Sequence, residues 1–483
     1  MDASPSALVR LLAPKLPYIL KTALLHSLWL SPTSTKWDLR TELTIKITRE
    51  IVSGPDPSSI TKQQQYSLRD PGVKGRMWIS RVTMPAPAED DIRQTLFEAI
   101  DDLKEGQETY TQPDLASVEA EWSGYRPDVA KDAPEPSIPE SEKYANLTKE
   151  ATSSVVVLYF HGGAYYLLDP ASHRVSTTKL ARLTSGRVLS IRYRLSPQHA
   201  FPAALLDALV SYLSLLYPPP GSFHDPTPAS SIVFAGDSAG GNLSLALLQF
   251  LLHLHRTSPA GRTPTVTFHG KQVELLLPAG AATNSPWMDL TRCLPSLETN
   301  AQYDYLPPPS MSAKTRFPPC PLWPTNPPRA DLYCDGPTMC HPLVSPLAAA
   351  SWEGSPPLFM VCGEEMLTDE DKVVAARAAK QGVQVVWEQY EAMPHCFAMM
   401  LEGLEGSRMC FASWAKFCRD VVERPGEVKT EGWFIKAKTL ERNSVDVKSL
   451  SEFTDEEVRK RMQEATRKRI EGLEGEAKVQ PML

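Results

Sequence analysis

Residues 231–243 read Ser-Ile-Val-Phe-Ala-Gly-Asp-Ser-Ala-Gly-Gly-Asn-Leu, and this stretch decides the fold. The apolar, β-branched run at 232–235 predicts a buried strand, and the apolar spacing from Leu243 onward predicts a helix. Between them lies Gly236-Asp237-Ser238-Ala239-Gly240, a Gly-x-Ser-x-Gly motif. Its two glycines permit a strand-to-helix turn that is too sharp for larger side chains, and such a turn leaves the Ser238 hydroxyl exposed.

A second glycine motif lies upstream, where the predicted strand 154–160 runs into His161-Gly162-Gly163-Ala164-Tyr165. Two glycines after a buried strand let the backbone approach a ligand closely and turn its N–H groups outward. Acyl-transfer enzymes need such donors where a carbonyl oxygen becomes negatively charged. We therefore predict an oxyanion hole made by the N–H groups of Gly162, Gly163 and Ala239, the last at the positive end of the helix.

Several stretches, in the same order along the chain, resemble the hormone-sensitive-lipase family of α/β-hydrolases, which includes arylacetamide deacetylase-like esterases. They lie between about Ser153 and Phe417 and comprise His161–Ala164, Tyr193–Pro197, Phe201–Ala204, Gly236–Asn242, Ser285–Leu290, Pro342–Leu347, Gly363–Glu370 and Met393–Phe397. One departure is the oxyanion turn, where the family usually has three glycines and this chain has Gly162-Gly163-Ala164. The resemblance implies an α/β-hydrolase fold, with a mostly parallel central sheet flanked by helices and a helical cap.

A serine hydroxyl is a poor nucleophile at neutral pH, so Ser238 needs a base within hydrogen-bond reach. Of the ten histidines, His395 follows the last predicted core strand, 383–390, in a loop. Loops at the C-terminal ends of strands carry function in open α/β sheets. We predict His395 as the base, a structural role for His161 at the oxyanion strand end, and surface or packing roles for the other histidines.

The third member of the triad must orient the imidazole and stabilise its charged form. The chain order Ser, acid, His places it between Ser238 and His395. The resemblance implies Glu365, which follows the predicted strand 358–362 and stands two residues before Leu367, although many members carry Asp there. Asp369 is the alternative acid and Glu364 a more distant one, whereas Asp207 and Asp289 are interpreted as structural.

Strand-like and helix-like segments alternate from Ser153 onward, which favours a parallel sheet with helices on both faces. Beyond the two motif strands we expect strands at 187–193, 273–277, 358–362 and 383–390, and helices at 202–217 and 372–380. The predicted organisation is an N-terminal extension or cap (1–127, with a strand-like piece at 43–51), a linker (128–152), the catalytic domain (153–425, with a Pro-rich cap insertion at 303–340) and a charged tail (426–483). Within the tail, 455–473 predicts a solvated helix with pairs such as Glu456–Lys460 and Glu457–Arg461.

Composition limits the class of partner. A net charge of −7 and a pI near 5.9 disfavour nucleic acid as a partner. The eight cysteines all lie from Cys293 onward and form no Cys-x-x-Cys pair, so we expect neither a structural zinc site nor, given the serine chemistry, any other metal or cofactor. This cysteine usage is ordinary for an intracellular enzyme, and we expect a cytoplasmic protein.

The N-terminal stretch 7–30 is rich in leucine but interrupted by Arg10, Lys15 and Lys21. Its longest uncharged run, 22–35, is too short to span a bilayer, and no clean signal-peptide core precedes a small-residue cleavage site. Three interpretations remain open: a cap helix over the active site, a helix that lies on a membrane surface, and an anchor in an internal membrane such as the endoplasmic reticulum.

The predicted function is hydrolysis of small or medium acyl esters, in particular acetyl esters, of a hydrophobic alcohol through a Ser238–His395–Glu365 triad and an acyl-enzyme. Two alternatives use the same scaffold. One is a non-hydrolytic enzyme of secondary metabolism that catalyses cyclisation or lactone formation. The other is a ligand-binding module, against which the retained His395 argues, because the receptors that resemble this family lack that histidine.

Overall fold

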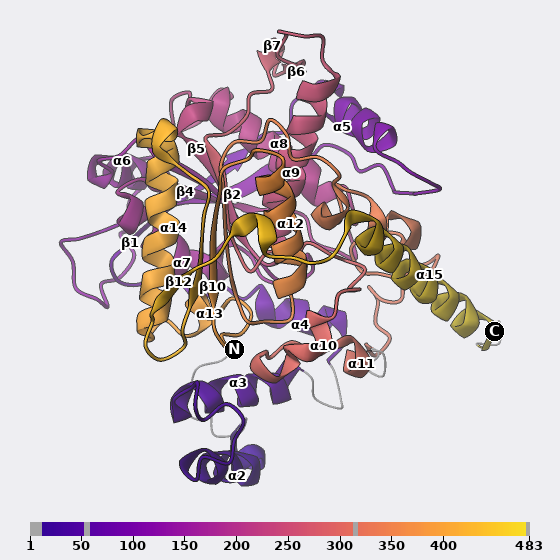
Figure 1. Ribbon diagram of the computed structural model, residues 1–483. Helices are drawn as coiled ribbons and strands as arrows, with labels where there is room; N and C mark the ends of the chain where they lie inside the picture. Colours follow the sequence, from indigo (N-terminus) through magenta and orange to yellow (C-terminus); the bar gives the residue numbers. More distant parts are fainter. Residues whose placement is uncertain (1–11, 53–57, 313–316, 480–483) are drawn as a thin grey trace.

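The computed structural model describes residues 12–52, 58–312 and 317–479, and a ten-stranded sheet runs through it (Figure 1). In spatial order the strands are β1 (Met77–Met84), β2 (Val118–Tyr125), β4 (Arg187–Arg192), β3 (Val156–Phe160), β5 (Ile232–Asp237), β8 (Gly280–Asn284), β9 (Leu358–Gly363), β10 (Val385–Tyr390), β11 (Glu431–Ile435) and β12 (Arg442–Ser444). Neighbouring strands from β4 to β11 are parallel, whereas β1, β2 and β12 pair antiparallel. The predicted mostly parallel sheet is confirmed.

Helices cover both faces of the sheet (Figure 1). One face carries α7 (Pro170–Thr184) and α14 (Glu405–Glu423), and the other carries α8 (Ala203–Leu216), α9 (Ala239–Thr257) and α12 (Thr368–Lys380). Residues alternate along β3: Val156, Leu158 and Phe160 join the core under α8 and α9, whereas their neighbours join the core under α14. A strand that is buried on both faces in this way reads as a continuous apolar run.

The remaining elements lie around this layered core. They are α2 (Leu16–Ser27), α3 (Leu39–Val52), α4 (Ile60–Ser67), α5 (Asp91–Asp102), α6 (Glu140–Glu150), α10 (Ser296–Thr299), α11 (Pro309–Ser312), α13 (Phe397–Met400), α15 (Asp455–Val479) and a separate hairpin of β6 (Thr265–Phe268) and β7 (Lys271–Glu274). No helix among the described residues combines the length and the apolar character that crossing a bilayer requires. The first eleven residues of the chain, which include the start of the leucine-rich stretch, lie outside the described residues.

Four expectations differ from the structure. The prediction of a strand-like piece at 43–51 is wrong, because these residues belong to α3, whose buried residues recur at helical spacing. The prediction of a core strand at 273–277 is also wrong. Strand β7 pairs only with β6, and the core strand in this part of the chain is β8. Helix α6 packs on β1 and β2 inside the stretch expected to be a linker. The tail helix α15 is not wholly solvated, since Val458 and Met462 are buried, although the Glu457–Arg461 pair forms at 3.3 Å.

Candidate active site

Ser238 lies at the sharp turn between β5 and α9. Its backbone has φ 53° and ψ −121°, a region that ordinary residues avoid. A methyl group on Gly240 would lie 1.9 Å from the Phe160 carbonyl oxygen, and one on Gly236 would lie 2.4 Å from the Gly240 backbone. Neither position can carry a side chain, so both glycines are required for the turn that leaves Ser238 partly exposed.

Three side chains from distant parts of the chain form one hydrogen-bonded series. The Ser238 hydroxyl lies 2.9 Å from His395 Nε2. On the other side of the ring, His395 Nδ1 lies 2.6 Å from Glu365 Oε2. His395 and Glu365 are buried. The structure therefore brings together the predicted nucleophile, base and acid.

Two further contacts hold the loop that carries His395. The N–H of Cys396 donates to the Ser285 hydroxyl at 3.0 Å. Asp304, which the sequence analysis did not single out, is fully buried and accepts from the N–H of Met366 at 2.9 Å and, more weakly, from that of His395 at 3.4 Å. Because Asp304 touches the segments of both the acid and the base, it fixes their relative position.

Electrostatics favour the protonated form of His395. Burial alone lowers the pKa of its imidazole, but the neighbouring Cys396 and Glu365 side chains more than offset this and raise that pKa well above its usual value. The Cys396 thiol is not charged at neutral pH, because burial raises its pKa to about 12. Glu365 is therefore the group that stabilises an imidazolium as it forms, as a triad carboxylate must.

The N–H groups of the glycine turn after β3 differ in whether they already have a hydrogen-bond partner. The Gly162 N–H donates to Asp237 Oδ1 at 3.2 Å, so it is not free for a ligand while that bond is made. The N–H groups of Gly163 and Ala164 make no hydrogen bond with any described residue. Gly163 has φ 110° and Ala164 φ 51°, and Ala239 begins α9, where helical N–H groups lack partners. The N–H groups of Gly163, Ala164 and Ala239 are therefore the candidate donors to a substrate oxygen.

A buried polar cluster lies beneath this turn. Asp237 accepts from the Tyr159 hydroxyl at 2.6 Å and pairs with His173 Nε2 at 3.2 Å. Burial opposes both charges, but each partner offsets this for the other: the pKa of Asp237 is lowered and that of His173 is raised. The sequence predicted only a surface or packing role for His173. A signal existed in Asp237 itself, since a carboxylate at the end of a buried strand needs a partner.

His161, expected to be structural, is fully buried and stacks on Tyr193 with ring centroids 4.2 Å apart. Burial and the nearby His173 lower its pKa to about 3, so it is neutral. The Tyr193 hydroxyl donates to the His161 carbonyl at 2.7 Å, which fixes the start of the glycine turn.

The other candidate acids bond elsewhere. Asp369 Oδ2 accepts from the N–H of Ser296 at 2.9 Å, and Glu364 Oε2 accepts from the N–H of Ala392 at 2.9 Å. Asp207 forms a buried ion pair with Arg194 at 2.8 Å. Neither of the two alternative acids, Asp369 and Glu364, bonds to His395 within the described part of the chain, and nor does Asp207, which was interpreted as structural.

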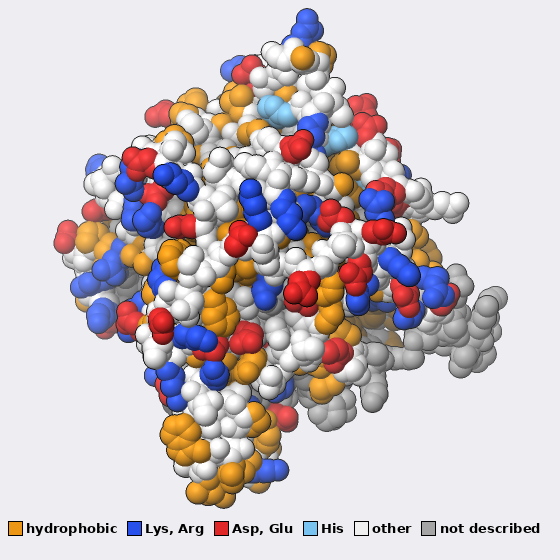
Figure 2. Space-filling view, in the orientation of Figure 1, with side chains coloured by type: hydrophobic (Ala, Val, Ile, Leu, Met, Phe, Trp, Pro, Cys, Tyr) orange, Lys and Arg blue, Asp and Glu red, His pale blue; other side chains and the backbone are white. Residues whose placement is uncertain are grey.

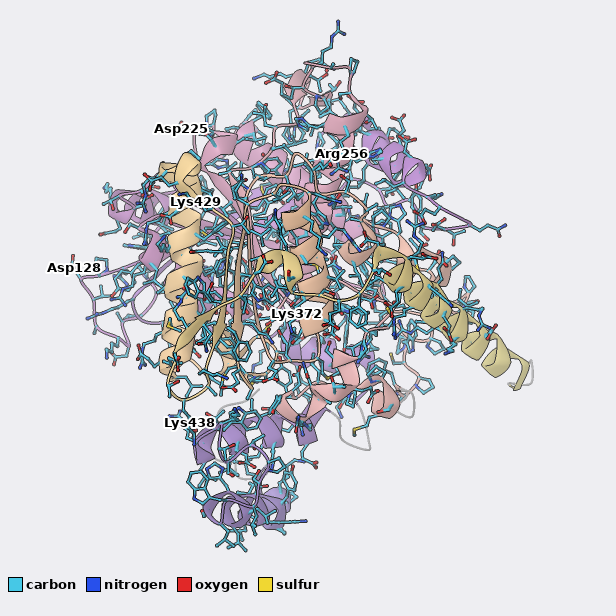
Figure 3. The ribbon with its side chains drawn as sticks, in the orientation of Figure 1. Asp128, Asp225, Arg256, Lys372, Lys429 and Lys438 are labelled. Carbon is cyan, nitrogen blue, oxygen red and sulfur yellow. The ribbon has the colours of Figure 1, made fainter. Side chains whose placement is uncertain are left out.

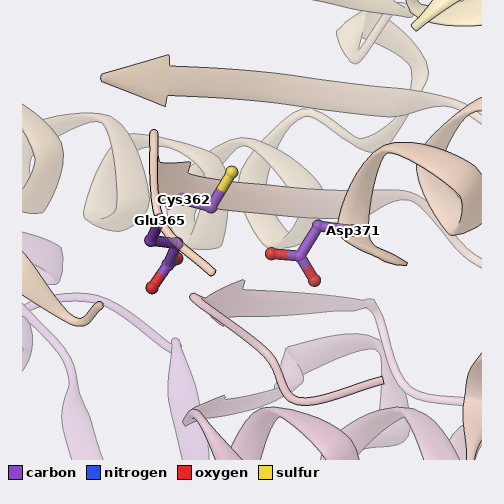
Figure 4. Close-up of side chains that lie close together, drawn as sticks. All are labelled: Cys362, Glu365 and Asp371. Carbon is purple, nitrogen blue, oxygen red and sulfur yellow. The ribbon is translucent and has the colours of Figure 1, made fainter. Parts of the chain in front are cut away.

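Behind the acid, Cys362, Glu365 and Asp371 lie close together, with one potential ligand atom from each inside a 4.8 Å span (Figure 4). Both oxygens of the buried Asp371 carboxyl lack hydrogen-bond partners in this structure, and burial raises its pKa well above the usual range. Glu365 is already bonded to His395 at 2.6 Å, so this cluster shares a carboxylate with the Ser238–His395–Glu365 series.

Comparison with known proteins gives three findings. A family described as alpha/beta hydrolase fold matches residues 157–399. A protein named acetyl-hydrolase from Streptomyces hygroscopicus is 34% identical over 240 residues, which are 50% of this chain and 67% of that protein. An esterase from Acinetobacter venetianus is 28% identical over 270 residues, covering 56% of this chain and 76% of that protein.

Solved structures agree on the fold. The crystal structure of EstE5 soaked with p-nitrophenyl butyrate superposes with a TM-score of 0.52 at 23% identity, over 78% of this chain and 97% of that one. An esterase/lipase from an uncultured bacterium superposes with a TM-score of 0.51 at 22% identity. At this identity the likeness concerns the fold alone.

Proposed function

The chain belongs to the alpha/beta hydrolase fold family, and from that premise we propose that Ser238, His395 and Glu365 form its catalytic triad. It is an esterase-type hydrolase and acts on small-molecule carboxylic esters. One observation carries the assignment of roles: the unbroken series from Ser238 Oγ through the His395 ring to Glu365 Oε2, with distances of 2.9 and 2.6 Å.

In the proposed reaction, His395 Nε2 accepts the Ser238 proton as the hydroxyl oxygen attacks the ester carbonyl carbon. The carbonyl oxygen becomes negative and is stabilised by the N–H groups of Gly163 and Ala239. Ala164 supplies the third donor, because the Gly162 N–H is held by Asp237. Each such donor is worth ~3 kcal/mol of transition-state stabilisation.

The imidazolium next returns its proton to the leaving alcohol oxygen, and an acyl-enzyme remains on Ser238. A water molecule then gives its proton to His395 and attacks the acyl carbon, and collapse of the second tetrahedral intermediate releases the acid and restores the Ser238 hydroxyl. Glu365 keeps its charge throughout and stabilises the imidazolium in both halves of the cycle.

We propose acyl groups of small or medium size, acetyl in particular, on a hydrophobic alcohol. The relative named acetyl-hydrolase, at 34% identity, supports this substrate class. The cap that would select the alcohol comprises α3 of the N-terminal extension and the insertion 303–340. A contact between these two parts supports a common cap: Arg49 on α3 donates to the carbonyl of Asp304 at 2.7 Å.

The test is hydrolysis of p-nitrophenyl acetate and butyrate by the purified chain, with Ser238→Ala as the comparison. We expect kcat to fall by roughly 10⁶-fold in the variant, with an unchanged melting temperature. Labelling of the wild type, but not the variant, by a fluorophosphonate probe identifies the nucleophile. A wild type that neither labels nor hydrolyses any ester would refute the proposal.

We also propose that the N-terminal helix makes peripheral contact with a membrane. Several of its leucines are exposed in the structure, which supports this partner over a purely internal packing role.

A further inference from the structure

Three of the leucines of α2, Leu16, Leu20 and Leu24, are exposed to solvent. Leu20 is 66% exposed and Leu24 60%, and the same face continues through Leu16, Leu28, Trp29 and Leu30. The opposite side of α2 packs on α3 through polar groups instead. Thr22 is its one buried residue, and His26 Nδ1 lies 2.5 Å from the buried Glu42. Figure 2 shows this apolar patch at the tip of the molecule that α2 and α3 form in Figure 1.

Monomeric proteins in water rarely expose a continuous row of large apolar side chains, because each one forgoes the gain from burial. Here the row, Leu16, Leu20, Leu24 and Leu28, follows a four-residue spacing along one helical stripe. The neighbouring helix α3 carries a shallow hollow of its own, of about 620 Å³, lined by residues such as Leu39, Leu43 and Ile47.

The charge around the leucine stripe is positive, although the whole chain has a net charge of −7. Between Asp2 and Asp38 the sequence holds no acidic residue, and its basic residues are Arg10, Lys15, Lys21 and Lys36. Lys36 is paired with Glu391 at 2.6 Å, so Lys15 and Lys21 are the described basic side chains that belong to the helix. Lys438, labelled in Figure 3, reaches the same tip: its Nζ donates to the Ser34 carbonyl at 3.1 Å and lies 5.2 Å from the Trp29 ring centroid. Basic side chains beside an apolar stripe, with an exposed tryptophan at the stripe's end, match the interface of an anionic bilayer.

We propose that α2 docks on anionic phospholipid membranes through the leucine stripe, defined as Leu16, Leu20, Leu24, Leu28, Trp29 and Leu30. The docked enzyme draws its esters from the lipid phase. A second copy of the chain is a poorer occupant, because it would place like charges against each other at Lys15 and Lys21. The part of this inference that concerns substrate rests on the proposed esterase function.

The docked helix is joined to the catalytic loops. Trp37 Nε1 donates to the Ala392 carbonyl at 2.7 Å, three residues before His395. Arg49 binds the carbonyl of Asp304, and the Tyr305 ring beside it lies 6.1 Å from the His395 ring. A membrane that holds α2 therefore lies at the end of the molecule where the N-terminal helices contact the catalytic loops, and the docked enzyme would meet esters dissolved in that membrane at this end.

The test is flotation of the full chain with phosphatidylcholine vesicles that contain or lack phosphatidylserine. We expect flotation with the anionic vesicles and little with the neutral ones. Leu20→Glu and Leu24→Glu should each weaken flotation by roughly tenfold or more, since each removes a leucine from the lipid phase. Val175→Glu is the matched control, because Val175 is also half exposed but lies on α7. It introduces the same charge and should float as the wild type does.

Activity gives the second measurement. Leu20→Glu should lose most hydrolysis of p-nitrophenyl decanoate carried in anionic vesicles and keep wild-type hydrolysis of dissolved p-nitrophenyl acetate. Wild type that does not float, or Leu20→Glu that floats equally well, would overturn the docking proposal. The docking proposal would also be overturned if the wild type did not bind vesicles but formed a dimer that Leu20→Glu converted to a monomer. That result would mean that the leucine stripe binds a second copy of the chain. If the wild type does not hydrolyse p-nitrophenyl acetate, the esterase function is refuted. Flotation then still tests membrane docking separately.

Discussion

Gly363 and Met393 meet through bare backbone: a methyl group on Gly363 would lie 2.0 Å from the Met393 carbonyl oxygen. Gly363 ends β9, two residues before Glu365, and Met393 lies in the loop after β10, two residues before His395. The separation of 2.6 Å between Glu365 and His395 therefore depends on a contact that leaves no space for a side chain. Side-chain geometry in the triad is set by how closely two main chains can approach.

Gly363→Ala should lower kcat by about 10²-fold, because a displacement of the His395 loop by about 1 Å misplaces the base. Gly403→Ala is the control, since no atom lies within 4 Å of the added methyl group, and it should leave kcat unchanged. The measurement is steady-state hydrolysis of p-nitrophenyl butyrate. Wild-type kcat in Gly363→Ala would mean that the two loops can separate without cost to the triad.

The choice of Glu365 over Asp369 has its own test. Glu365→Gln should lower kcat by about 10⁴-fold, since an amide cannot stabilise the imidazolium and favours the wrong tautomer of His395. Asp369→Asn should lower it by no more than a few-fold, because Asp369 bonds to the N–H of Ser296. Both are read from kcat with the same ester. Equal losses in the two variants would contradict the assignment of the acid.

The nucleophile turn could be predicted because its geometry restricts residue type locally: only glycine fits at Gly236 and Gly240. Strand β8 could not, since Gly-Ala-Ala-Thr-Asn is buried on both faces by its neighbours and shows neither alternation nor a long apolar run. Asp304 was missed for a related reason. Its role arises from contacts with Met366 and His395, which are distant in sequence.

The acid was predicted from family resemblance rather than from spacing, because several carboxylates follow β9 and no local pattern separates them. The buried pairing of Asp237 with His173 shows the same limit. A carboxylate at the end of a buried strand indicates that a partner is needed, but the sequence offers ten histidines. Only the fold shows that His173 Nε2 lies 3.2 Å from Asp237 Oδ1.

The pH dependence of kcat/KM should show an acid limb. Only neutral His395 can accept the Ser238 proton, and its pKa is raised, so activity should rise with pH through an apparent pKa above about 6.5. Glu365→Gln should move this limb to lower pH, because it removes a neighbour that raises the pKa. The measurement is kcat/KM as a function of pH for the wild type and for the residual activity of Glu365→Gln. A wild-type apparent pKa below about 6.5, the ordinary pKa of histidine, would contradict the expectation.

The His173–Asp237 pair should make stability depend on pH. The raised pKa of His173 means that its contribution is complete below about pH 6.5 and is lost as pH rises through the higher folded value. Asp237, with a lowered pKa, contributes above about pH 4 and loses this only as pH falls further. His173→Asn should lower the free energy of unfolding by about 3 kcal/mol at pH 6, with a smaller deficit at pH 9.

Urea denaturation at several pH values measures this deficit, and His224→Asn is the control. Burial lowers the pKa of His224, so its replacement should cost no less at pH 9 than at pH 6, the opposite direction to His173→Asn. A deficit in His173→Asn that does not change with pH would mean that His173 acts by packing alone.

The glycine turn gives the last prediction. A methyl group on Gly163 would lie 2.2 Å from the Leu167 carbonyl oxygen, so Gly163→Ala must shift the turn and its amides, and kcat should fall by about 10²- to 10³-fold, the cost of an oxyanion donor. Ala164 already has φ 51°, so Ala164→Gly relieves strain without moving the N–H. It should raise the free energy of unfolding by about 0.5–1 kcal/mol and keep kcat within a few-fold. Full activity in Gly163→Ala would show that the oxyanion is stabilised elsewhere.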